Sequence, residues 1–508
     1  MKLIFQAYSV VLQVLAAVTL VTPALAEIVN INLLQLNDIY EITPVEGGTR
    51  GGLARVATLR KQLYKANPRT YTVLAGDAFS PSALGTAKIN GTPLAGQQMV
   101  AVMNALGFDY ATFGNHEFDL PENLFYQRLQ ESQFRWISSN VSARTGQPFK
   151  GVPRSIVFNV KGDRGAVVRV GLIGVTLNSN QPNYVSYTDP IATAKQQVIA
   201  LKGKADIIVA ITHLSIEDDR KLAETVPEID IILGGHEHEN IQQWRGRDFT
   251  PIFKADANAR TVYVHQLSYD TIDKSLAINS RLVPITEKIP DDPKTAKIVK
   301  EWLERGYQAF RAAGFEPTQE IGQLTFALDG LESSVRNTST KLTELIAEAM
   351  LQEVPDADLA VFNGGSIRID DVIPPGPITQ FDVIRILPFG GKVVAIEIDG
   401  ALLQRVLDRG QANKGTGGYL QTAKVSQQAN SKNWLVQGQP LDPKRTYKIA
   451  INDFLISGKE KGLDFLNLQQ PGIKLIAEKR DIRFVMIDRL KHQATSSNLL
   501  KSDSLNYP

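Results

Sequence analysis

The stretch Leu33-Leu34-Gln35-Leu36-Asn37-Asp38-Ile39-Tyr40-Glu41 decides how the first half of the chain is interpreted. Its apolar run is typical of a buried strand, and the run stops abruptly at Asn37 and Asp38. A carboxylate at the end of a strand is a candidate metal ligand. Tyr40 lies two residues further on, so its side chain points the same way as that of Asp38 and is a candidate for sharing the same metal.

The same order of apolar strand, polar loop and amphipathic helix recurs along residues 27–290. We expect strands at residues 31–36, 71–74, 110–113, 135–137, 169–173, 207–211 and 229–233. Polar or glycine-rich sequence follows these strands, including Asp77, Asn115, His213 and His236. This layout predicts an α/β layered domain that binds ligands beyond the carboxyl ends of its strands.

A second domain follows a charged helical segment. At 508 residues the chain is long enough for two or three domains. A helix is expected over residues 293–313, and its apolar stripe indicates a packed linker rather than a loose tether. The second domain should contain strands at 359–362, 393–398 and 446–451 and helices at 343–353 and 400–408. The predicted divisions are 1–26, 27–290, 291–320, 321–490 and a polar tail at 491–508.

Composition narrows the classes of function. The 55 basic and 53 acidic residues give a net charge of +2, so the composition lacks the excess of positive charge that is typical of proteins that bind nucleic acid. The chain has no cysteine, which excludes disulfides and thiolate ligands. Any metal site must therefore use His, carboxylate, Asn, Tyr or water, a set that suits hard or borderline divalent ions and trivalent iron.

The first 26 residues have the features of a secretory signal peptide. Lys2 gives a positive start, residues 10–21 are apolar, and Ala24-Leu25-Ala26 has the form of a cleavage site before Glu27. A retained anchor is the alternative, although the apolar stretch is short for a membrane span. We therefore expect a periplasmic or secreted protein that has no membrane segment after the signal is removed.

Four of the six histidines stand at predicted strand ends, beside three other candidate ligands. The set is Asp38, Asp77, Asn115, His116, His213, His236 and His238. Each residue alone is more simply a capped strand end or a core histidine. Together they suffice for two metal ions that share one carboxylate and polarise a water.

These residues lie in blocks that resemble a known superfamily. Asp38-x-Tyr40, Gly76-Asp77, Gly114-Asn115-His116-Glu117, Thr212-His213 and Gly235-His236-Glu237-His238 resemble the five blocks of calcineurin-like metallophosphoesterases. Residues 363–368, 387–391 and 452–454 resemble the substrate-binding domain of the 5′-nucleotidase family. The resemblance implies a four-layer αββα domain, a linker helix and a smaller α+β C-terminal domain.

The resemblance also implies roles for single residues. Asp38, Asp77 and His238 would hold one divalent metal, and Asp77, Asn115, His213 and His236 would hold the other, with Mn, Zn, Mg and Ca as candidates. A hydroxide bound by both metals would attack phosphorus. His116 and Asp119 match the family's catalytic pair, although Asp119 also suits a helix N-cap.

The substrate residues implied by the resemblance lie in the second domain. Arg336 and Arg368 would bind phosphate, Asn363 would face the nucleoside, and Phe389 and Phe454 would stack on the base. The family's ligand-touching Asp lies closer to Phe454 than Asp464 does here, which leaves the role of Asp464 open. Lys459, Lys461 and Arg385 add charges near the site, either for a more phosphorylated ligand or as solvated surface charge.

Tyr40 is a further departure, because the family normally has a metal-binding His at this position. A neutral phenol is a poor ligand for divalent ions. Three alternatives stay open. Tyr40 would bind trivalent iron as a phenolate, or it would stand near a divalent ion without binding it and so weaken that site. In the third alternative the first metal site is lost, and the protein binds nucleotides without turnover. His265, the only spare histidine that could compensate, is more simply an ordinary polar residue.

The sequence thus predicts an exported two-metal phosphohydrolase that acts on nucleoside 5′-monophosphates or related nucleotides. A 2′,3′-cyclic-nucleotide phosphodiesterase, a nucleotide-sugar hydrolase and a non-catalytic nucleotide-binding protein stay open as alternatives. Because the catalytic and substrate blocks lie in different domains, a hinge is expected near the linker helix.

Overall fold

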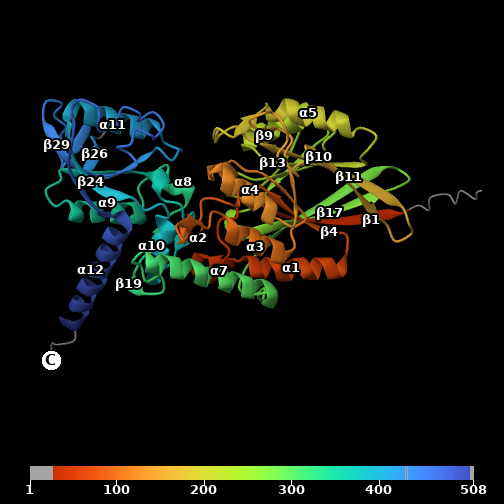
Figure 1. Cartoon of the computed structure of the whole chain (residues 1–508), viewed down its shortest axis with the longest axis horizontal. Coiled ribbons are helices and arrows are strands. Elements are labelled where there is room, and N and C mark those ends of the chain that lie inside the picture. Colours follow the sequence, from red (N-terminus) through yellow and green to blue (C-terminus); the bar gives the residue numbers. More distant parts are fainter. Residues whose placement is uncertain (1–26, 429–430, 432, 504–508) are drawn as a thin grey trace, which may run out of the picture.

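The computed structural model describes residues 27–428, 431 and 433–503. Figure 1 shows two domains side by side, with one helix running along the larger domain to the boundary between them. The predicted signal segment, residues 1–26, lies outside the described residues. Within the described ranges, none of the helices combines the length and apolar character that a membrane crossing requires.

Two six-stranded sheets form the centre of the first domain. The first sheet has the order β18-β17-β1-β4-β7-β8, in which β1, β4, β7 and β8 are parallel. Its strands are β1 (Ile28–Leu36), β4 (Thr70–Ala75), β7 (Tyr110–Thr112), β8 (Arg135–Ile137), β17 (Thr261–Asp270) and β18 (Ser275–Pro284). This parallel arrangement places the residues after β1, β4 and β7 at one edge of the sheet.

The second sheet has the order β10-β11-β13-β14-β16-β15, and its four central strands are parallel. They are β11 (Val167–Thr176), β13 (Ile207–His213), β14 (Ile231–Gly234) and β16 (Thr250–Lys254), flanked by β10 (Ser155–Lys161) and β15 (Ile241–Arg245). The seven strands predicted for this domain are therefore confirmed, with ends that differ by at most three residues.

Alternating side chains of the strands build separate cores. Leu33 of β1 packs between the two sheets with Val209 and Ile231, whereas Leu34 faces the helices on the outside. Helices α1 (Leu53–Ala66), α3 (Gln97–Leu106) and α4 (Glu122–Glu131) cover the first sheet, and α5 (Pro190–Leu201) and α6 (Ile216–Thr225) cover the second. The result is the four-layer αββα order visible in Figure 1.

The predicted linker helix is α7 (Pro293–Ala312). It begins at the side-chain cap of Asp292, and its apolar stripe packs into the same core as α1 and α3 through Ile298, Trp302 and Phe310. The expectation of a packed helix is confirmed. The helix packs against the first domain, and the second domain begins after it.

A five-stranded sheet of order β25-β21-β29-β24-β30 organises the second domain. Its strands are β21 (Leu359–Asn363), β24 (Lys392–Asp399), β25 (Leu420–Ala423), β29 (Thr446–Asn452) and β30 (Ile473–Asp481), with α9 (Lys341–Glu353), α10 (Gln380–Ile386) and α11 (Gly400–Ala412) beside it. The predicted strands and helices are confirmed. Helix α12 (Ile482–Asp503) continues through residues 491–503, so most of the predicted polar tail is helical.

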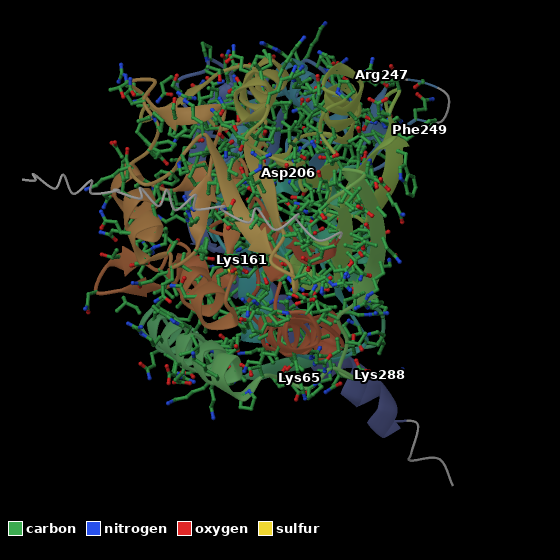
Figure 2. All side chains as sticks on the ribbon, turned by 90° about the vertical axis from the view of Figure 1, so that its right-hand side faces the viewer. Lys65, Lys161, Asp206, Arg247, Phe249 and Lys288 are labelled. Carbon is green, nitrogen blue, oxygen red and sulfur yellow. The ribbon has the colours of Figure 1, made fainter. Side chains whose placement is uncertain are left out.

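Figure 2 looks onto the end of the first domain that lies away from the second domain. Charged side chains of both signs, including Lys65, Lys161 and Asp206, cover this end, and Phe249 is 71% exposed there. Asp206 immediately precedes β13, so the amino ends of the parallel strands lie here. Their carboxyl ends point toward the second domain.

A buried lysine ties together two loops at those carboxyl ends. Lys254, the last residue of β16, is fully buried, and its Nζ donates to the carbonyls of Leu214 at 2.7 Å and Gly235 at 2.8 Å. The same Nζ forms ion pairs with Asp219, at 2.8 Å, and with Glu237. Lys254 therefore fixes the loops after β13 and β14 relative to each other.

We predict that Lys254→Met lowers the free energy of unfolding by about 3–5 kcal/mol, because it leaves the buried carboxylate of Asp219 without a counter-charge. The measurement is urea unfolding followed by circular dichroism. Lys254→Met combined with Asp219→Asn should recover part of the loss, and Lys294→Met, on the exposed face of α7, should change little. Equal stability of Lys254→Met and the natural protein would contradict this account.

Candidate active site

Two buried carboxylates and a histidine meet where three strands end. Asp38 follows β1, Asp77 follows β4, and His213 is the last residue of β13; all three are at most 1% exposed. One ligand atom from each lies within 4.8 Å of the others. This arrangement brings together residues that are far apart in the sequence, as predicted from the parallel strand order.

Two ligand atoms in this cluster have no hydrogen-bond partner among the described residues. His213 Nδ1 is 2.9 Å from the Ala75 carbonyl, which turns Nε2 toward the carboxylates. Nε2 lies 3.2 Å from Asp77 Oδ2 without hydrogen-bond geometry, and the buried Asn115 Oδ1 is also unpartnered. Buried polar atoms are normally satisfied, so each of these two atoms is a candidate ligand for a cation.

The backbone around the cluster is strained where the ligands are placed. Asp38, Asp77, His236 and His238 have φ values of 51°, 58°, 90° and 56°, in the left-handed region that non-glycine residues seldom adopt. At Gly114 a Cβ would lie 2.0 Å from Asp77 Oδ1, so only glycine allows this approach. Such conformations persist because the surrounding structure holds them.

Glu117 holds two of these loops, and the motif comparison gave it no role. Its buried carboxylate accepts from the backbone N–H groups of Asp77 at 2.9 Å, Ala78 at 2.6 Å and Gly114 at 2.5 Å. Burial and the nearby charge of Asp77 raise the pKa of Glu117 to about 7. The residue therefore positions the loops that carry Asp77 and Asn115.

The cluster attracts positive charge. Burial by itself lowers the pKa of His213, but the charges of Asp77 and Asp38 outweigh it and raise this pKa to about 9. His236 lies with its ring centroid 5.3 Å from that of His213, and burial together with the charge of His213 lowers its pKa to about 3. The same carboxylates that hold a proton on His213 would favour a metal cation in its place.

The hydroxyl of Tyr40 lies among the residues expected to form the first metal position. Its Oη lies 3.0 Å from Asp77 Oδ2, 3.0 Å from His238 Nε2 and 3.3 Å from Asp38 Oδ1. Burial and the charges of Asp77 and Asp38 raise the pKa of Tyr40 well above its ordinary value. Tyr40 is thus a protonated donor to the carboxylates. His265 lies elsewhere, bonded to Ser280 and Gln35 within the sheet.

His116 and Asp119 form a hydrogen-bonded pair beside the cluster. His116 Nδ1 is 2.7 Å from Asp119 Oδ2, while Asn180 Nδ2 donates to the other oxygen of Asp119 at 2.5 Å. Burial lowers the pKa of His116, but Asp77 and the bond to Asp119 together raise it above the ordinary value. Asp119 does not cap the next helix, because the N-cap of α4 is Pro121. Asn180 was not predicted from the sequence.

The two predicted phosphate ligands of the second domain lie beside one carboxylate. Arg336 pairs with Glu332 Oε1, and Arg368 Nη1 is 3.7 Å from the same oxygen. Glu332 Oε2 lies 3.7 Å from His238 Nδ1 in the first domain, and the charge of Arg368 acts against protonation of His116. The domain contact therefore brings the guanidinium groups to the cluster of carboxylates and histidines.

Asn363, Phe389 and Phe454 lie at one end of the second sheet. Val393 pairs with Asn452, so the loops before β24 and after β29 are neighbours, and Asn452 Nδ2 donates to Asn363 Oδ1 at 3.0 Å. Phe389 is 57% exposed and Phe454 41% exposed. Two exposed rings beside an amide suit the recognition of a flat polar group.

Five charged residues of the second domain refine or correct the expectations from the sequence. Asp464 is exposed, and Glu460 is the acidic residue that meets Asn363, accepting from its Nδ2 at 3.0 Å. Arg385 is a correction: its guanidinium is buried beside Asp371, Glu41 and Asp382, so its charge is neither solvated nor directed at a ligand. Lys459 and Lys461 are exposed.

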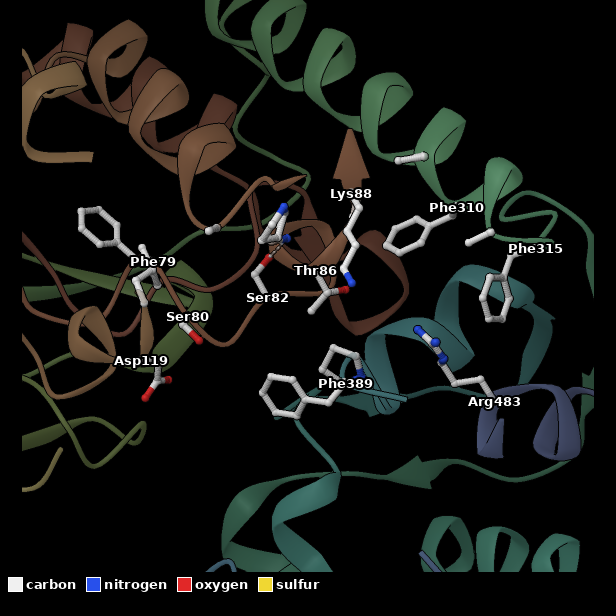
Figure 3. Close-up of a pocket in the computed structure, with 18 of the residues that line it drawn as sticks. Phe79, Ser80, Ser82, Thr86, Lys88, Asp119, Phe310, Phe315, Phe389 and Arg483 are labelled. Carbon is white, nitrogen blue, oxygen red and sulfur yellow. Dashed lines mark hydrogen bonds between the residues drawn. The ribbon is translucent and has the colours of Figure 1, made fainter. Parts of the chain in front are cut away.

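A cavity of about 600 Å³ opens between Asp119 and Phe389. In Figure 3 Asp119 lies at one end of it, Phe389 lies near the middle opposite Ser82 and Thr86, and Phe315 and Arg483 lie at the far end. The linker helix contributes Phe310 to its lining. The cavity therefore continues from Asp119 along the boundary between the domains.

Comparisons with known proteins agree with this arrangement. A family model described as calcineurin-like phosphoesterase matches residues 31–240, and a model of the 5′-nucleotidase C-terminal domain matches residues 320–467. Protein UshA of Yersinia enterocolitica is 28% identical over 412 residues, which cover 69% of this chain and 72% of that protein. A 5′-nucleotidase of Bos taurus is 26% identical over 493 residues, which cover 86% of this chain and 82% of that protein.

A solved structure supports the same relationship. The crystal structure of a 5′-nucleotidase precursor from Thermus thermophilus is 25% identical and has a TM-score of 0.73, covering 92% of this chain and 97% of that one. The two family models match the two domains described above in the same order. The chain therefore belongs to the 5′-nucleotidase family of calcineurin-like metallophosphoesterases and is a metal-dependent phosphoric ester hydrolase.

Proposed function

We propose that the chain is an exported dinuclear-metal phosphohydrolase that removes phosphate from nucleoside 5′-monophosphates or related nucleotides. One observation carries this proposal. Unpartnered ligand atoms of His213 and Asn115 in the first domain lie across the domain contact from Arg336 and Arg368 of the second. Metal ligands and guanidinium groups around one space suit a phosphate group.

The ligand residues divide into two overlapping sets. Asp77, Asn115, His213 and His236 would hold one divalent ion, and Asp38, Asp77 and His238 the other, with Tyr40 beside it. The residue types fit Mn, Zn, Mg or Ca. When bound, such a pair activates a water and neutralises charge on the phosphoryl oxygens. The geometry of Tyr40 favours a neutral donor at a weakened divalent site over a ferric phenolate.

The arginines bind and orient the phosphate. Each guanidinium group offers fork-shaped donors to two phosphate oxygens. Glu332 occupies the donors of Arg336 and lies 3.7 Å from Arg368, so an incoming phosphate must compete with this carboxylate. Displacement of one anion by another keeps the charge between the domains balanced.

His116 supplies the proton for the leaving group. Asp119 accepts from the protonated Nδ1, which directs Nε2 away from Asp119 and keeps the ring in one orientation. The leaving nucleoside oxygen takes the proton from Nε2 as the phosphorus–oxygen bond breaks. Asn180 fixes the carboxylate of Asp119 in turn.

The second domain selects the nucleoside. Phe389 and Phe454 would hold the base between two rings, and Asn363 with Glu460 would face polar atoms of the nucleoside. Base stacking is worth about 1–3 kcal/mol per base by alanine substitution. Stacking of this size distinguishes a nucleotide from a bare sugar phosphate.

The cavity beside Asp119 favours a second candidate, the hydrolysis of nucleotide sugars or dinucleotides. Its 600 Å³ extend from the catalytic pair and Phe389 toward Arg483, which leaves room for a group attached beyond the phosphate. Arg483 already pairs with Asp481, so it would approach such a group as part of a salt bridge. The proposed export depends on the signal-like residues 1–26 alone.

The function is tested with metal-stripped protein that is reloaded with a single metal and given one substrate at a time. We expect turnover of AMP, and of UDP-glucose or NAD if the cavity is used, whereas 2′,3′-cyclic AMP should react poorly. Phe389→Ala should raise KM for AMP about tenfold and leave KM for ribose 5-phosphate nearly unchanged. Nucleotide binding without turnover under any metal would contradict the proposed function.

The pH dependence of kcat should identify His116 as the acid. Its folded pKa lies above the ordinary value, so the protonated form is complete at lower pH and is lost as pH rises through that raised pKa. We expect kcat for AMP to fall on the alkaline side, and Asp119→Asn should move this fall to lower pH. His116→Ala should lower kcat by about 10²–10⁴. An alkaline limb that Asp119→Asn leaves in place would exclude this role.

Replacing Tyr40 tests its part in the first metal position. We predict that Tyr40→His tightens retention of one of two Mn²⁺ ions by about tenfold, because an imidazole ligand replaces a phenol. Competition with a chelator measures the retention. Tyr64→His, at a tyrosine that is 49% exposed on α1, is the matched control. A visible ferric-phenolate band in the natural protein would show that Tyr40 is itself a ligand.

A further inference from the structure

The second domain contacts a proposed metal ligand of the first. His238 directs Nε2 toward the first metal position, 3.5 Å from Asp38 Oδ1. Its other ring nitrogen, Nδ1, lies 3.0 Å from Oδ2 of Asp370, which belongs to the second domain. The two residues are 132 positions apart in the sequence.

Asp370 is held firmly in this position. Its other oxygen, Oδ1, accepts from the backbone N–H of Glu332 at 3.0 Å, and Arg260 Nη2 lies 3.7 Å from Oδ2. The residue is 5% exposed and has a φ of 39°. A buried carboxylate in a strained backbone conformation, bonded on both oxygens, has little freedom to turn away.

The loop that carries Asp370 also carries the substrate residues. Asn363 ends β21, Arg368 follows, and Asp370 comes two residues later, just before β22 (Val372–Ile373). Arg368 donates its backbone N–H to the Ile386 carbonyl at 3.0 Å, which anchors the loop to α10. One anchored loop therefore presents groups to the nucleoside, the phosphate and His238.

A carboxylate at Nδ1 has a known effect on a metal-binding histidine. It fixes the tautomer with hydrogen on Nδ1, leaves Nε2 free as a ligand, and orients the ring. Loss of such a partner typically weakens metal affinity about 10–100-fold. In this chain the partner comes from the other domain.

We propose that Asp370 is a positioning residue for the first metal position, acting through His238, so that metal binding there and docking of the second domain stabilise each other. The inference rests on the proposed two-metal site and adds a coupling to it. By thermodynamic linkage, whatever the docked domain adds to metal affinity, the bound metal must add to docking.

The adjacent residue provides a matched control. Asp371 is fully buried and also crosses the domain contact, but it accepts from the backbone N–H of Glu46 at 3.1 Å and pairs with Arg385 at 2.9 Å. None of its bonds reaches His238. Asp371→Asn therefore loosens the same contact without removing the partner of the metal ligand.

The experiment measures Mn²⁺ binding to the full-length protein by chelator competition, independently of turnover. We expect Asp370→Asn to weaken one of two ions by about 10–100-fold and the other by less than about threefold. Asp371→Asn should leave both within about threefold. Saturating Mn²⁺ should restore kcat of Asp370→Asn on AMP without changing KM, which general damage to the domain contact would not allow.

Linkage provides a second measurement. The backbone N–H of Glu46, which donates across the contact to Asp371, should exchange with solvent faster in metal-free than in Mn²⁺-loaded protein. In Asp370→Asn this difference should shrink. If Asp370→Asn does not fold, Asp370→Glu, which keeps the charge but moves the carboxylate, should weaken the same ion.

The proposal is overturned if Asp370→Asn leaves both affinities unchanged, or if Asp371→Asn weakens them equally. Failure of the proposed function has a different signature. Natural protein that binds two ions tightly but turns over no nucleotide would refute the substrate assignment and leave the role of Asp370 intact.

Discussion

The molecule is organised around two buried carboxylates that require positive charge beside them. Asp38 and Asp77 are almost fully buried at the ends of neighbouring strands, and Asp77 lies 3.2 Å from the unpartnered Nε2 of His213. Burial of two like charges is unfavourable unless positive charge compensates them. The left-handed backbone at both residues, the glycine at position 114 and the bonds of Glu117 hold the two carboxylates in place. A bound metal cation would supply the positive charge that the two carboxylates require.

The second domain completes the same electrostatic system. It adds the positive charges of Arg336 and Arg368 near the proposed phosphate position and the negative charges of Glu332 and Asp370 near His238. Positive and negative charges therefore alternate across the contact between the domains, which favours docking. The arginine donors would also be available to an anionic substrate. The hinge expected near the linker helix stays a prediction.

The sequence predicted those parts that depend on local order. The proximity of strand-end residues such as Asp38 and His213 could be predicted, because parallel strands place their carboxyl ends together. Asp370, Glu117 and Asn180 were missed, because their partners are set by loop conformation and by contacts between distant segments. Arg385 was misjudged for the same reason: the three carboxylates around it come from residues 41, 371 and 382. The role of Asp464 stayed open in the sequence; this residue is exposed, and Glu460 is the acidic residue that accepts from Asn363.

The most direct test of the two-metal centre is an anomalous-difference map from crystals of Mn²⁺-loaded protein. The account predicts two peaks on either side of Asp77. One peak should lie among Asn115, His213 and His236, and a weaker one should lie beside Tyr40 and His238. A single peak, or peaks away from Asp77, would contradict a dinuclear centre and with it the proposed chemistry.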